Sequence, residues 1–363
     1  MTATTTPGTE VTCPNCRSKS MMPLVETPPQ LGSVPQKPAP RERIDSPVGG
    51  MANRLIDNIE KVIVGKRDEI MLTVMAYLAE GHVLLEDVPG VAKTMLARAL
   101  ARSIGCNFKR IQCTPDLLPN DITGSSIFNP KSTEFEFRAG PLFAQIVLAD
   151  EINRATPRAQ AALLEAMAER KVTADGTNYE LTPPFLLIAT QNPIDHEGTF
   201  PLPEAQLDRF LVRLSLGYPH FDNEVSMLLR LKLQHPIETL EAVATAEDIL
   251  KSQAAVREVF ADEKVLRYIV QVIQATRENY DILLGGSPRA SMALLHCAQA
   301  FAAIQGFDFV SPDDVKRVSP YVLGHRLILK PESRIRKKTV AGVLAEILDS
   351  VPVPQMSADG ALR

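Results

Sequence analysis

The sequence predicts an α/β fold, in which a parallel sheet flanked by helices is followed by a smaller, all-helical domain. Short, almost wholly apolar runs alternate with helical segments from residue 51 to about 220, and the strand signals stop after Tyr218-Pro219. Near-continuous apolar strands are typical of a parallel sheet buried on both faces. A chain of 363 residues is longer than one ordinary domain. We therefore expect an α/β core domain over residues 51–220 and a helical domain over 221–350.

The first 50 residues are expected to be a disordered tail. They hold 9 of the 28 prolines and no Phe, Tyr or Trp, so they cannot bury enough apolar surface to offset the entropy of ordering. Residues 351–363 are expected to be a flexible C-terminus. Cys13 and Cys16 have the spacing of half a zinc site, but no second pair or nearby histidine completes four ligands in the sequence, which favours two ordinary thiols.

Periodicity predicts the elements of the folded part in order. Two helices are expected first, with apolar positions Leu55, Ile56, Ile59, Ile70, Val74 and Leu78, separated by the break Val64-Gly65-Lys66. Strands are expected at residues 81–85, 108–112, 146–149, 185–189 and 211–214, with helices between them, such as 158–170. The second domain should contain helices at 265–279, 288–304, 313–318 and 340–348. Ser311 is expected to cap the third of these, with Pro312 just inside it.

Composition narrows the class of protein. The net charge of −4 gives no electrostatic footprint for nucleic acid, which usually shows as a basic domain or stripe. No stretch of the sequence approaches the ~20 apolar residues that span a bilayer, and the N-terminus lacks a signal-like pattern. Five scattered cysteines do not resemble a disulfide framework. We therefore expect a cytoplasmic protein that does not insert into membranes.

A candidate phosphate-binding loop follows the first predicted strand and reads Val88-Pro89-Gly90-Val91-Ala92-Lys93-Thr94. Such a loop needs inward-pointing N–H groups, a lysine for the phosphates and a hydroxyl for Mg²⁺, and Lys93 and Thr94 supply the last two. The strict pattern GxxxxGK[ST] is not met, because Asp87 and Ala92 stand at its two glycine positions. Taken alone, the loop is also compatible with a lysine on the first turn of an ordinary helix.

Two further predicted strands end in polar side chains. The run over 146–149 ends in Asp150-Glu151, and the next strand ends in Thr190-Gln191-Asn192. Asp150 is expected to hold Mg²⁺, and Glu151 to take a proton from the water that attacks the γ-phosphate. Asn192 is expected to orient that water, because ligands of open α/β sheets bind beyond the carboxyl ends of the strands. The alternatives are a helix N-terminus for the two acids and a turn for the asparagine.

Two arginines could stabilise the charge of a transferring phosphoryl group: Arg209 in Leu207-Asp208-Arg209-Phe210 and Arg289 in Ser287-Pro288-Arg289. Each by itself is more often a surface ion-pair partner, and the sequence alone does not place either.

Together these segments resemble the MoxR family of AAA+ ATPases, from about Ile56 to Leu348. The stretches that carry the resemblance are residues 84–94, 149–155, 160–167, 189–193, 203–210 and 287–290. The resemblance implies an AAA+ P-loop core with a helical lid, and Mg²⁺-dependent hydrolysis of ATP. It implies that Glu151, Asn192 (sensor 1), Arg209 (arginine finger) and Arg289 (sensor 2) serve catalysis.

The resemblance also implies which residues bind the cofactors. The nucleotide would be bound by Val64, Gly65, Val88, Pro89, Gly90, Val91, Ala92, Lys93, Thr94, Met95 and Asp150, and Mg²⁺ by Thr94 and Asp150. Ala92 is a variant that the family itself uses. Asp87 is a departure, since its side chain is expected near the phosphates, where it would affect nucleotide affinity.

The resemblance further implies a ring of this chain with itself, usually a hexamer, because a finger supplied to a neighbour needs a heterologous interface that closes. Residues 116–139 and 171–181 resemble the two hairpin inserts of the family and are candidates for partner contact. Asp175-Gly176 is a good hairpin turn. The implied partner is a separate client, often a protein with a von Willebrand factor A (VWA) domain and a metal site.

Two other functions stay open at this point. A motor that moves along nucleic acid is disfavoured by the net negative charge of the chain. It is also disfavoured by the two predicted hairpins, whose only cationic residues are Lys131, Arg138 and Lys171. A scaffold that binds ATP but hydrolyses it poorly is suggested by Asp87 and Ala92.

Overall fold

The computed structural model describes residues 10–12, 19–21, 43, 46–193, 198–231 and 235–354. Its centre is a five-stranded sheet in the order β11-β3-β10-β7-β4, and all the strand pairs are parallel. The strands are β3 (Val83–Glu86), β4 (Phe108–Gln112), β7 (Ile146–Asp150), β10 (Leu186–Gln191) and β11 (Val212–Leu214). The predicted parallel sheet is therefore confirmed.

Helices cover both faces of the sheet, as the apolar strands require. α1 (Pro47–Glu60), α2 (Arg67–Leu78) and α3 (Lys93–Ile104) share one buried cluster with alternate strand residues such as Val83 and Leu85. α5 (Pro157–Glu169) contributes to a second cluster with the intervening residues, such as Leu84. Because side chains alternate across a strand, β3, β7 and β10 contribute to both clusters.

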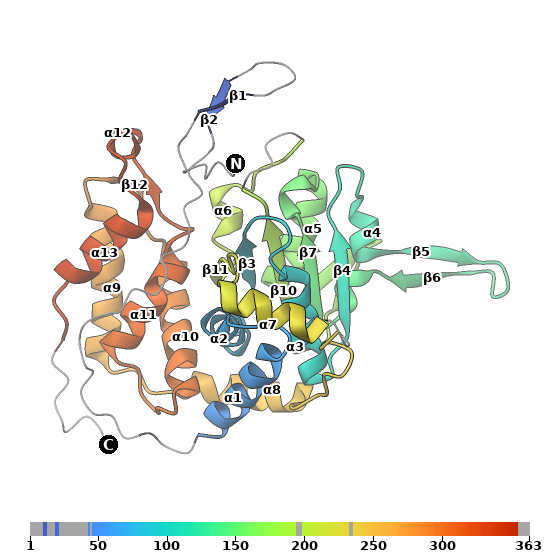
Figure 1. Cartoon of the computed structure of the whole chain (residues 1–363). Coiled ribbons are helices and arrows are strands. Elements are labelled where there is room, and N and C mark those ends of the chain that lie inside the picture. The colour runs from blue at the N-terminus through green and yellow to red at the C-terminus, as the bar shows by residue number, and fades with distance from the viewer. Residues whose placement is uncertain are drawn as a thin grey trace.

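The lid lies at one side of the sheet (Figure 1). Its helices are α9 (Glu263–Glu278), α10 (Pro288–Ile304), α11 (Pro312–Leu323), α12 (Pro331–Ile335) and α13 (Val340–Ser350). The preceding helix, α8 (Ala246–Arg257), packs against α1, α2 and α10. The expectation of an all-helical domain needs one correction. β12 (Ile282–Leu284) pairs antiparallel with β13 (Ile328–Leu329), and these two apolar runs are too short to stand out from the helical pattern around them. Ser311 caps α11 as predicted, accepting a hydrogen bond from the Asp314 N–H.

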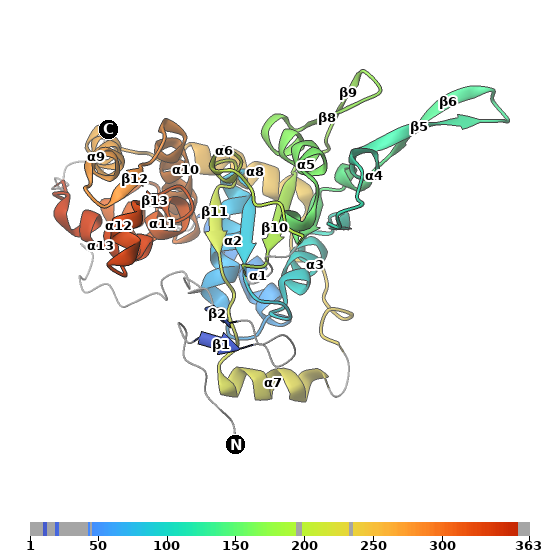
Figure 2. The ribbon, with the colours of Figure 1, turned by 90° about the horizontal axis from the view of Figure 1, so that it is seen from above.

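Two hairpins project from the side away from the lid (Figures 1 and 2). β5 (Gly124–Asn129) pairs with β6 (Glu134–Ala139), and β8 (Lys171–Ala174) pairs with β9 (Thr177–Glu180). The first follows the short helix α4 (Pro119–Thr123) and the second follows α5. Asp175 and Gly176 both have positive φ, as the predicted Asp-Gly turn requires. Both hairpin predictions are confirmed.

The connecting elements complete the fold. They are the 3₁₀ turns η1 (Pro141–Phe143) and η2 (Ile152–Arg154), and the helices α6 (Glu204–Leu207) and α7 (Phe221–Leu231). Figure 2 shows α6 and α7 beyond opposite ends of the sheet. Within the described part of the chain, no helix is long and apolar enough to cross a membrane.

The N-terminal region is described only in part. β1 (Glu10–Thr12) pairs antiparallel with β2 (Lys19–Met21), and α1 begins at Pro47, before the expected boundary at residue 51. Cys13 and Cys16 lie outside the described residues, as does most of the expected tail, and so do residues 355–363. The domain boundaries and the disorder of both ends therefore stay predictions.

His82 joins the sheet to α5 through both of its ring nitrogens. The Leu187 N–H donates to Nδ1 at 3.1 Å, and Nε2 lies 3.1 Å from the Met167 carbonyl oxygen. A ring that accepts at Nδ1 and donates at Nε2 is neutral. Burial lowers the pKa of His82 to about 4. A proton on Nδ1 would break the bond to Leu187.

This histidine should make stability depend on pH. Between about pH 6.5 and 4 the unfolded chain binds a proton at His82 and the folded chain does not. The free energy of unfolding should therefore fall as the pH is lowered through this range, by at most about 1.4 kcal/mol per pH unit. Urea unfolding of the wild type and of His82→Gln at a series of pH values measures this, and the variant should show the shallower dependence. Equal slopes would contradict the assignment.

Candidate functional site

The phosphate loop, residues 88–92, connects the end of β3 to the start of α3. Gly90 has φ +87° and open space where a Cβ would lie, so its backbone can be approached closely. Ala92 takes the left-handed conformation, with φ 62°, at the position where the strict pattern has glycine. No side chain caps α3, so the N–H groups of its first turn are available to an anion.

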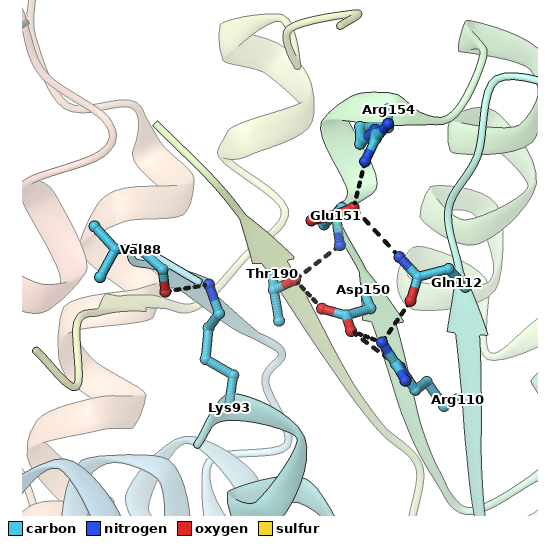
Figure 3. A network of polar contacts seen from close by, with 8 residues as sticks. All are labelled: Val88, Lys93, Arg110, Gln112, Asp150, Glu151, Arg154 and Thr190. Carbon is cyan, nitrogen blue, oxygen red and sulfur yellow. Dashed lines mark hydrogen bonds and ion pairs between the residues drawn. The ribbon is translucent and has the colours of Figure 1, made fainter. Parts of the chain in front are cut away.

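Lys93 points back along this loop. Its Nζ donates to the carbonyl oxygens of Asp87 at 2.7 Å and Val88 at 3.3 Å (Figure 3). Burial lowers the pKa of Lys93, and the nearby carboxylates of Asp87, Asp150 and Glu151 act in the opposite direction. The amino group is thus positioned at the loop with carboxylates around it, and it must leave the two carbonyls to meet phosphates.

Asp87 bonds both the phosphate loop and the segment that follows β11. Its Oδ1 accepts a hydrogen bond from the Val88 N–H at 3.2 Å. Its Oδ2 accepts hydrogen bonds from the N–H groups of Leu216 at 2.5 Å and Gly217 at 2.8 Å, and from the Ser215 hydroxyl at 3.1 Å. The side chain is buried, with its carboxylate satisfied by the segment that follows β11. The residue therefore fastens β3 to the start of the connection toward α7, and its effect on bound phosphates stays a prediction.

Asp150 and Glu151 leave the carboxyl end of β7, as predicted. Thr190 donates to Asp150 Oδ1 at 2.6 Å, and Arg110 donates to Oδ2 from Nε at 2.9 Å and from a terminal nitrogen at 2.6 Å (Figure 3). Arg110 thereby supplies a cation to the carboxylate that is expected to hold Mg²⁺. Binding of Mg²⁺ at Asp150 would compete with this ion pair.

Glu151 is held in a strained backbone conformation. Its φ is 58°, and its N–H donates to the Thr190 hydroxyl at 2.8 Å. The carboxylate accepts from Arg154 at 3.0 Å and from Gln112 at 3.3 Å. A non-glycine residue with positive φ persists only where its surroundings fix it, and such residues cluster at functional sites. Glu151 is thus held by three neighbouring side chains on three elements.

Asn192 follows β10 and is buried at the same edge of the sheet. Its carbonyl oxygen lies 3.5 Å from Asn153 Nδ2, which ties it to the turn after β7. The structure therefore brings Lys93, Asp150, Glu151 and Asn192 to one edge, as the parallel strands predicted.

Val64 and Gly65 lie in the turn between α1 and α2, against α7. Gly65 has φ +71°, and a Cβ there would come within 1.9 Å of Asn223 Nδ2. Lys66 Nζ donates to the Tyr218 carbonyl oxygen at 3.0 Å, beside the segment that Asp87 holds. Val64 and Gly65 are therefore attached to the same connection as the phosphate loop, and their predicted contact with the nucleotide, at its adenine by resemblance to the family, stays a prediction.

Arg209 lies at the other edge of the sheet. It precedes β11, and the first residue of that strand, Val212, pairs with Val83, the first residue of β3. The phosphate loop leaves the opposite end of β3, so the four-residue strand separates the two edges by roughly 13 Å, at about 3.3 Å per residue. The side chain is exposed and donates to the Leu164 carbonyl oxygen at 2.8 Å.

Arg289 lies near the same far edge, in the first turn of α10. The hydroxyl of Ser287, the cap of this helix, donates to Asp208 Oδ2 at 3.2 Å. Asp208 directly precedes Arg209, so the two predicted arginines are near each other and away from Lys93. The sequence left open which of the two arginines acts on the nucleotide of a neighbouring subunit. Both lie near the amino edge of the sheet, so their positions do not distinguish them.

A buried ion pair fixes the lid to the segment that carries Arg209. Arg326 Nε donates to Asp208 Oδ1 at 2.7 Å, and its terminal nitrogens donate to the carbonyl oxygens of Phe210 at 2.6 Å and Leu211 at 3.1 Å. Only 4% of the Arg326 side chain is exposed. Burial lowers its pKa and Asp208 opposes that shift. Lid and arginine segment are therefore held together as one unit.

Sequence reasoning did not identify four residues that shape the site: Arg110, Gln112, Thr190 and Arg326. Arg110 and Gln112 alternate on β4, and hence share a face of that strand. When a strand pairs with one that ends in carboxylates, polar residues at its alternate positions indicate side chains that contact those carboxylates. Arg326 lies 118 positions from its partner Asp208, and no spacing in the sequence connects them.

The residues present fit a nucleotide with Mg²⁺. The uncapped first turn of α3 offers N–H groups to phosphates, Thr94 lies in that turn, and Asp150 offers a carboxylate oxygen. Mg²⁺ is usually held by one or two protein oxygens together with phosphates and water, which these two residues can supply.

Comparison with known proteins agrees with this geometry. Residues 82–212 match the family described as "ATPase family associated with various cellular activities (AAA)", and residues 274–347 match the "AAA lid domain". A solved structure from Cytophaga hutchinsonii superposes with a TM-score of 0.80 at 36% identity, covering 85% of this chain and 96% of its own. Fold and site together define an ATPase of the AAA+ class.

Named relatives narrow the class. "Chaperone MoxR1" of Mycobacterium tuberculosis is 40% identical over 314 residues, covering 84% of this chain and 83% of that protein. "Protein MoxR" of Methylorubrum extorquens is 31% identical, with 84% and 95% covered. "Uncharacterized protein YeaC" of Bacillus subtilis is 52% identical, also with 84% and 95% covered. The chain belongs to the MoxR family of AAA+ ATPases.

The position of Asp87 gives a direct test. Asp87→Gly restores the first glycine of the strict pattern, but it leaves the buried N–H groups of Leu216 and Gly217 without their acceptor. We expect unchanged or weaker nucleotide binding and a loss of about 1–3 kcal/mol in the free energy of unfolding. Ala92→Gly is the matched control, because it changes the other departure from the pattern and relieves a positive φ. Tighter nucleotide binding by Asp87→Gly would contradict the assignment.

Proposed function

We propose that this chain hydrolyses ATP with Mg²⁺ in a homo-oligomeric ring, a hexamer by resemblance, and uses the energy to remodel or mature a separate client protein in the cytoplasm. The observation that carries the proposal is the division of the site between the two edges of one sheet. Lys93, Asp150 and Glu151 lie at the carboxyl edge, and Arg209 and Arg289 at the amino edge. A head-to-tail ring would unite the two sets at each interface.

The proposed chemistry is in-line attack of water on the γ-phosphate. Glu151 accepts the proton of that water and Asn192 orients it, while the N–H groups of residues 93–95 and the Lys93 amino group bind the phosphates. Mg²⁺ at Thr94 and Asp150 would neutralise phosphate charge. Glu151 must release Arg154 or Gln112 to reach water, so these two residues hold the base until substrate is in place.

The hairpins support the proposal of client contact. Phe128 and Phe135 form an edge-to-face pair at the β5–β6 hairpin, and both are exposed. At the base of the hairpin Phe137 stacks on Tyr179 of β9, with centroids 4.1 Å apart. The Ser126 N–H also donates to Asp175 at 3.0 Å. The two hairpins are thus joined, so a client bound at one would act on both. We propose a separate client, such as a VWA-domain protein.

Removal of the base tests the hydrolysis. Glu151→Gln keeps the phosphate and Mg²⁺ ligands and lacks a proton acceptor, so we expect ATP binding with phosphate release slowed about 10²- to 10⁴-fold. Phosphate release and nucleotide binding of the variant and the wild type measure this. Equal rates would show that Glu151 is not the base, and would favour a scaffold that hydrolyses ATP poorly.

Mixed rings test the division of the site. Arg209→Ala and Lys93→Ala subunits should each be inactive alone, because each lacks one half of every interface. Mixing them should restore part of the ATPase activity, at interfaces that pair an intact carboxyl edge with an intact amino edge. The control is a mixture of either single variant with the Arg209→Ala/Lys93→Ala double variant. It should stay inactive, because no interface then pairs two intact edges. Rings that form without any recovery would contradict a finger acting on the neighbour.

A further inference from the structure

The helix α7 exposes its apolar face. Phe221, Val225, Leu228 and Leu229 are spaced as i, i+4, i+7 and i+8, so they form one stripe along the helix. Their exposed fractions range from 40% to 81%. We call these four residues the α7 stripe. An amphipathic helix in a monomer normally turns such a stripe inward, and a contiguous exposed patch marks an interaction site.

The opposite face of α7 is the one that holds the helix in place. Asn223 is half-buried against Gly65, and an Arg230 terminal nitrogen donates to the Lys61 carbonyl oxygen at 3.0 Å. Ser226 and Met227 are also half-buried. A mainly polar face is therefore fastened to the turn between α1 and α2, and this attachment leaves the α7 stripe directed away from the core.

The α7 stripe lies at the edge of the sheet that carries the phosphate loop. α7 follows β11 beyond the carboxyl ends of the strands, as Figure 2 shows. Its first residue, Phe221, is separated by only three residues from the segment of residues 215–217 that Asp87 binds. Whatever covers the stripe thus also approaches the nucleotide site.

A second exposed apolar patch flanks Arg289 on the lid. Leu283, Leu284 and Met292, the residues of this lid patch, have exposed fractions between 46% and 64%. They lie in β12 and in the first two turns of α10, on either side of Ser287, which bonds Asp208. The lid patch therefore belongs to the amino edge, opposite the α7 stripe.

We propose that the α7 stripe of one subunit docks on the lid patch of the next. The inference rests on the proposed function, because Arg289 reaches a neighbour's phosphates only if the amino edge of its subunit faces that neighbour's carboxyl edge. The charges agree. The exposed charges of α7 are Asp222, Glu224 and Arg230, and those beside the lid patch are Arg277, Glu278 and Arg289, so the two surfaces carry opposite net charges. The contact is heterologous, so repetition builds a ring.

A contact between two α7 helices is the disfavoured arrangement. It would be isologous and close at two subunits, leaving every arginine away from a neighbour's phosphate loop.

Assembly of a paired variant tests the docking. Leu228→Ser/Leu229→Ser should raise the concentration needed for ring formation about tenfold or more, as followed by native mass spectrometry with Mg-ATP in a Glu151→Gln background. Its thermal unfolding should be unchanged, because both side chains are exposed. Leu266→Ser/Val270→Ser on α9 is the matched control, with two exposed apolar residues away from both patches, and should assemble normally. Unchanged assembly of the α7 variant, or equal loss in the control, would overturn the proposal.

Cross-linking identifies which surface covers the α7 stripe. A mixture of Leu229→Cys and Leu284→Cys subunits should yield a disulfide-linked dimer on mild oxidation, above the background of the parent chain. Dimers formed by Leu229→Cys alone would indicate an α7–α7 contact, and an intrachain link to Cys13 or Cys16 would indicate cover by the tail. Either result overturns the proposal.

The two proposals can fail separately. If Leu228→Ser/Leu229→Ser forms rings and hydrolyses ATP normally, the docking is wrong and the shared site stands. If it stays monomeric yet hydrolyses ATP at the wild-type rate, the arginines do not act on a neighbour.

Discussion

The common direction of the five strands is the constraint on which the rest of the site depends. In a parallel sheet every strand ends at the same edge, so the chain can gather Lys93, Asp150, Glu151 and Asn192 from distant positions without any long-range pairing between them. The same constraint places the residue before a strand at the other edge. Arg209 precedes β11 and is therefore kept away from its own phosphate loop, whatever rotamer it takes.

The two edges are nevertheless mechanically connected through β11. At its carboxyl end Asp87 binds the N–H groups of Leu216 and Gly217, and at its amino end Arg326 binds Asp208 and the carbonyl oxygens that follow. Both carboxylates are buried or nearly so, and loss of one member of a buried ion pair leaves an uncompensated charge. The phosphate loop is thus connected through β11 to the lid and to Arg209, and in the ring that we propose this connection would link the nucleotide site to the subunit interface.

Much of this could be predicted from the sequence, because the relevant signals are local. Apolar runs of four to six residues locate the strands, and a polar side chain at the end of such a run locates an edge. The sequence could not show the distant partners of single side chains. Its pattern places Asp87 beside the phosphate loop, but the N–H groups and the hydroxyl that bond Asp87 Oδ2 belong to residues more than 125 positions later. The strand pair in the lid was missed because strands of two and three residues carry no period of their own.

The helix α7 shows a further limit of reasoning from periodicity. An apolar stripe predicts a helix reliably, but the assumption that the stripe faces the chain's own core holds only for a molecule complete in one copy. Here the polar face is fastened by Asn223 and Arg230, and the apolar face lies at the edge of the sheet that carries the candidate nucleotide site. The ring that we propose accounts for both features: a site divided between subunits would need an apolar contact surface next to it, because the arginine of a neighbour would stabilise a transition state only while the two edges stay in contact.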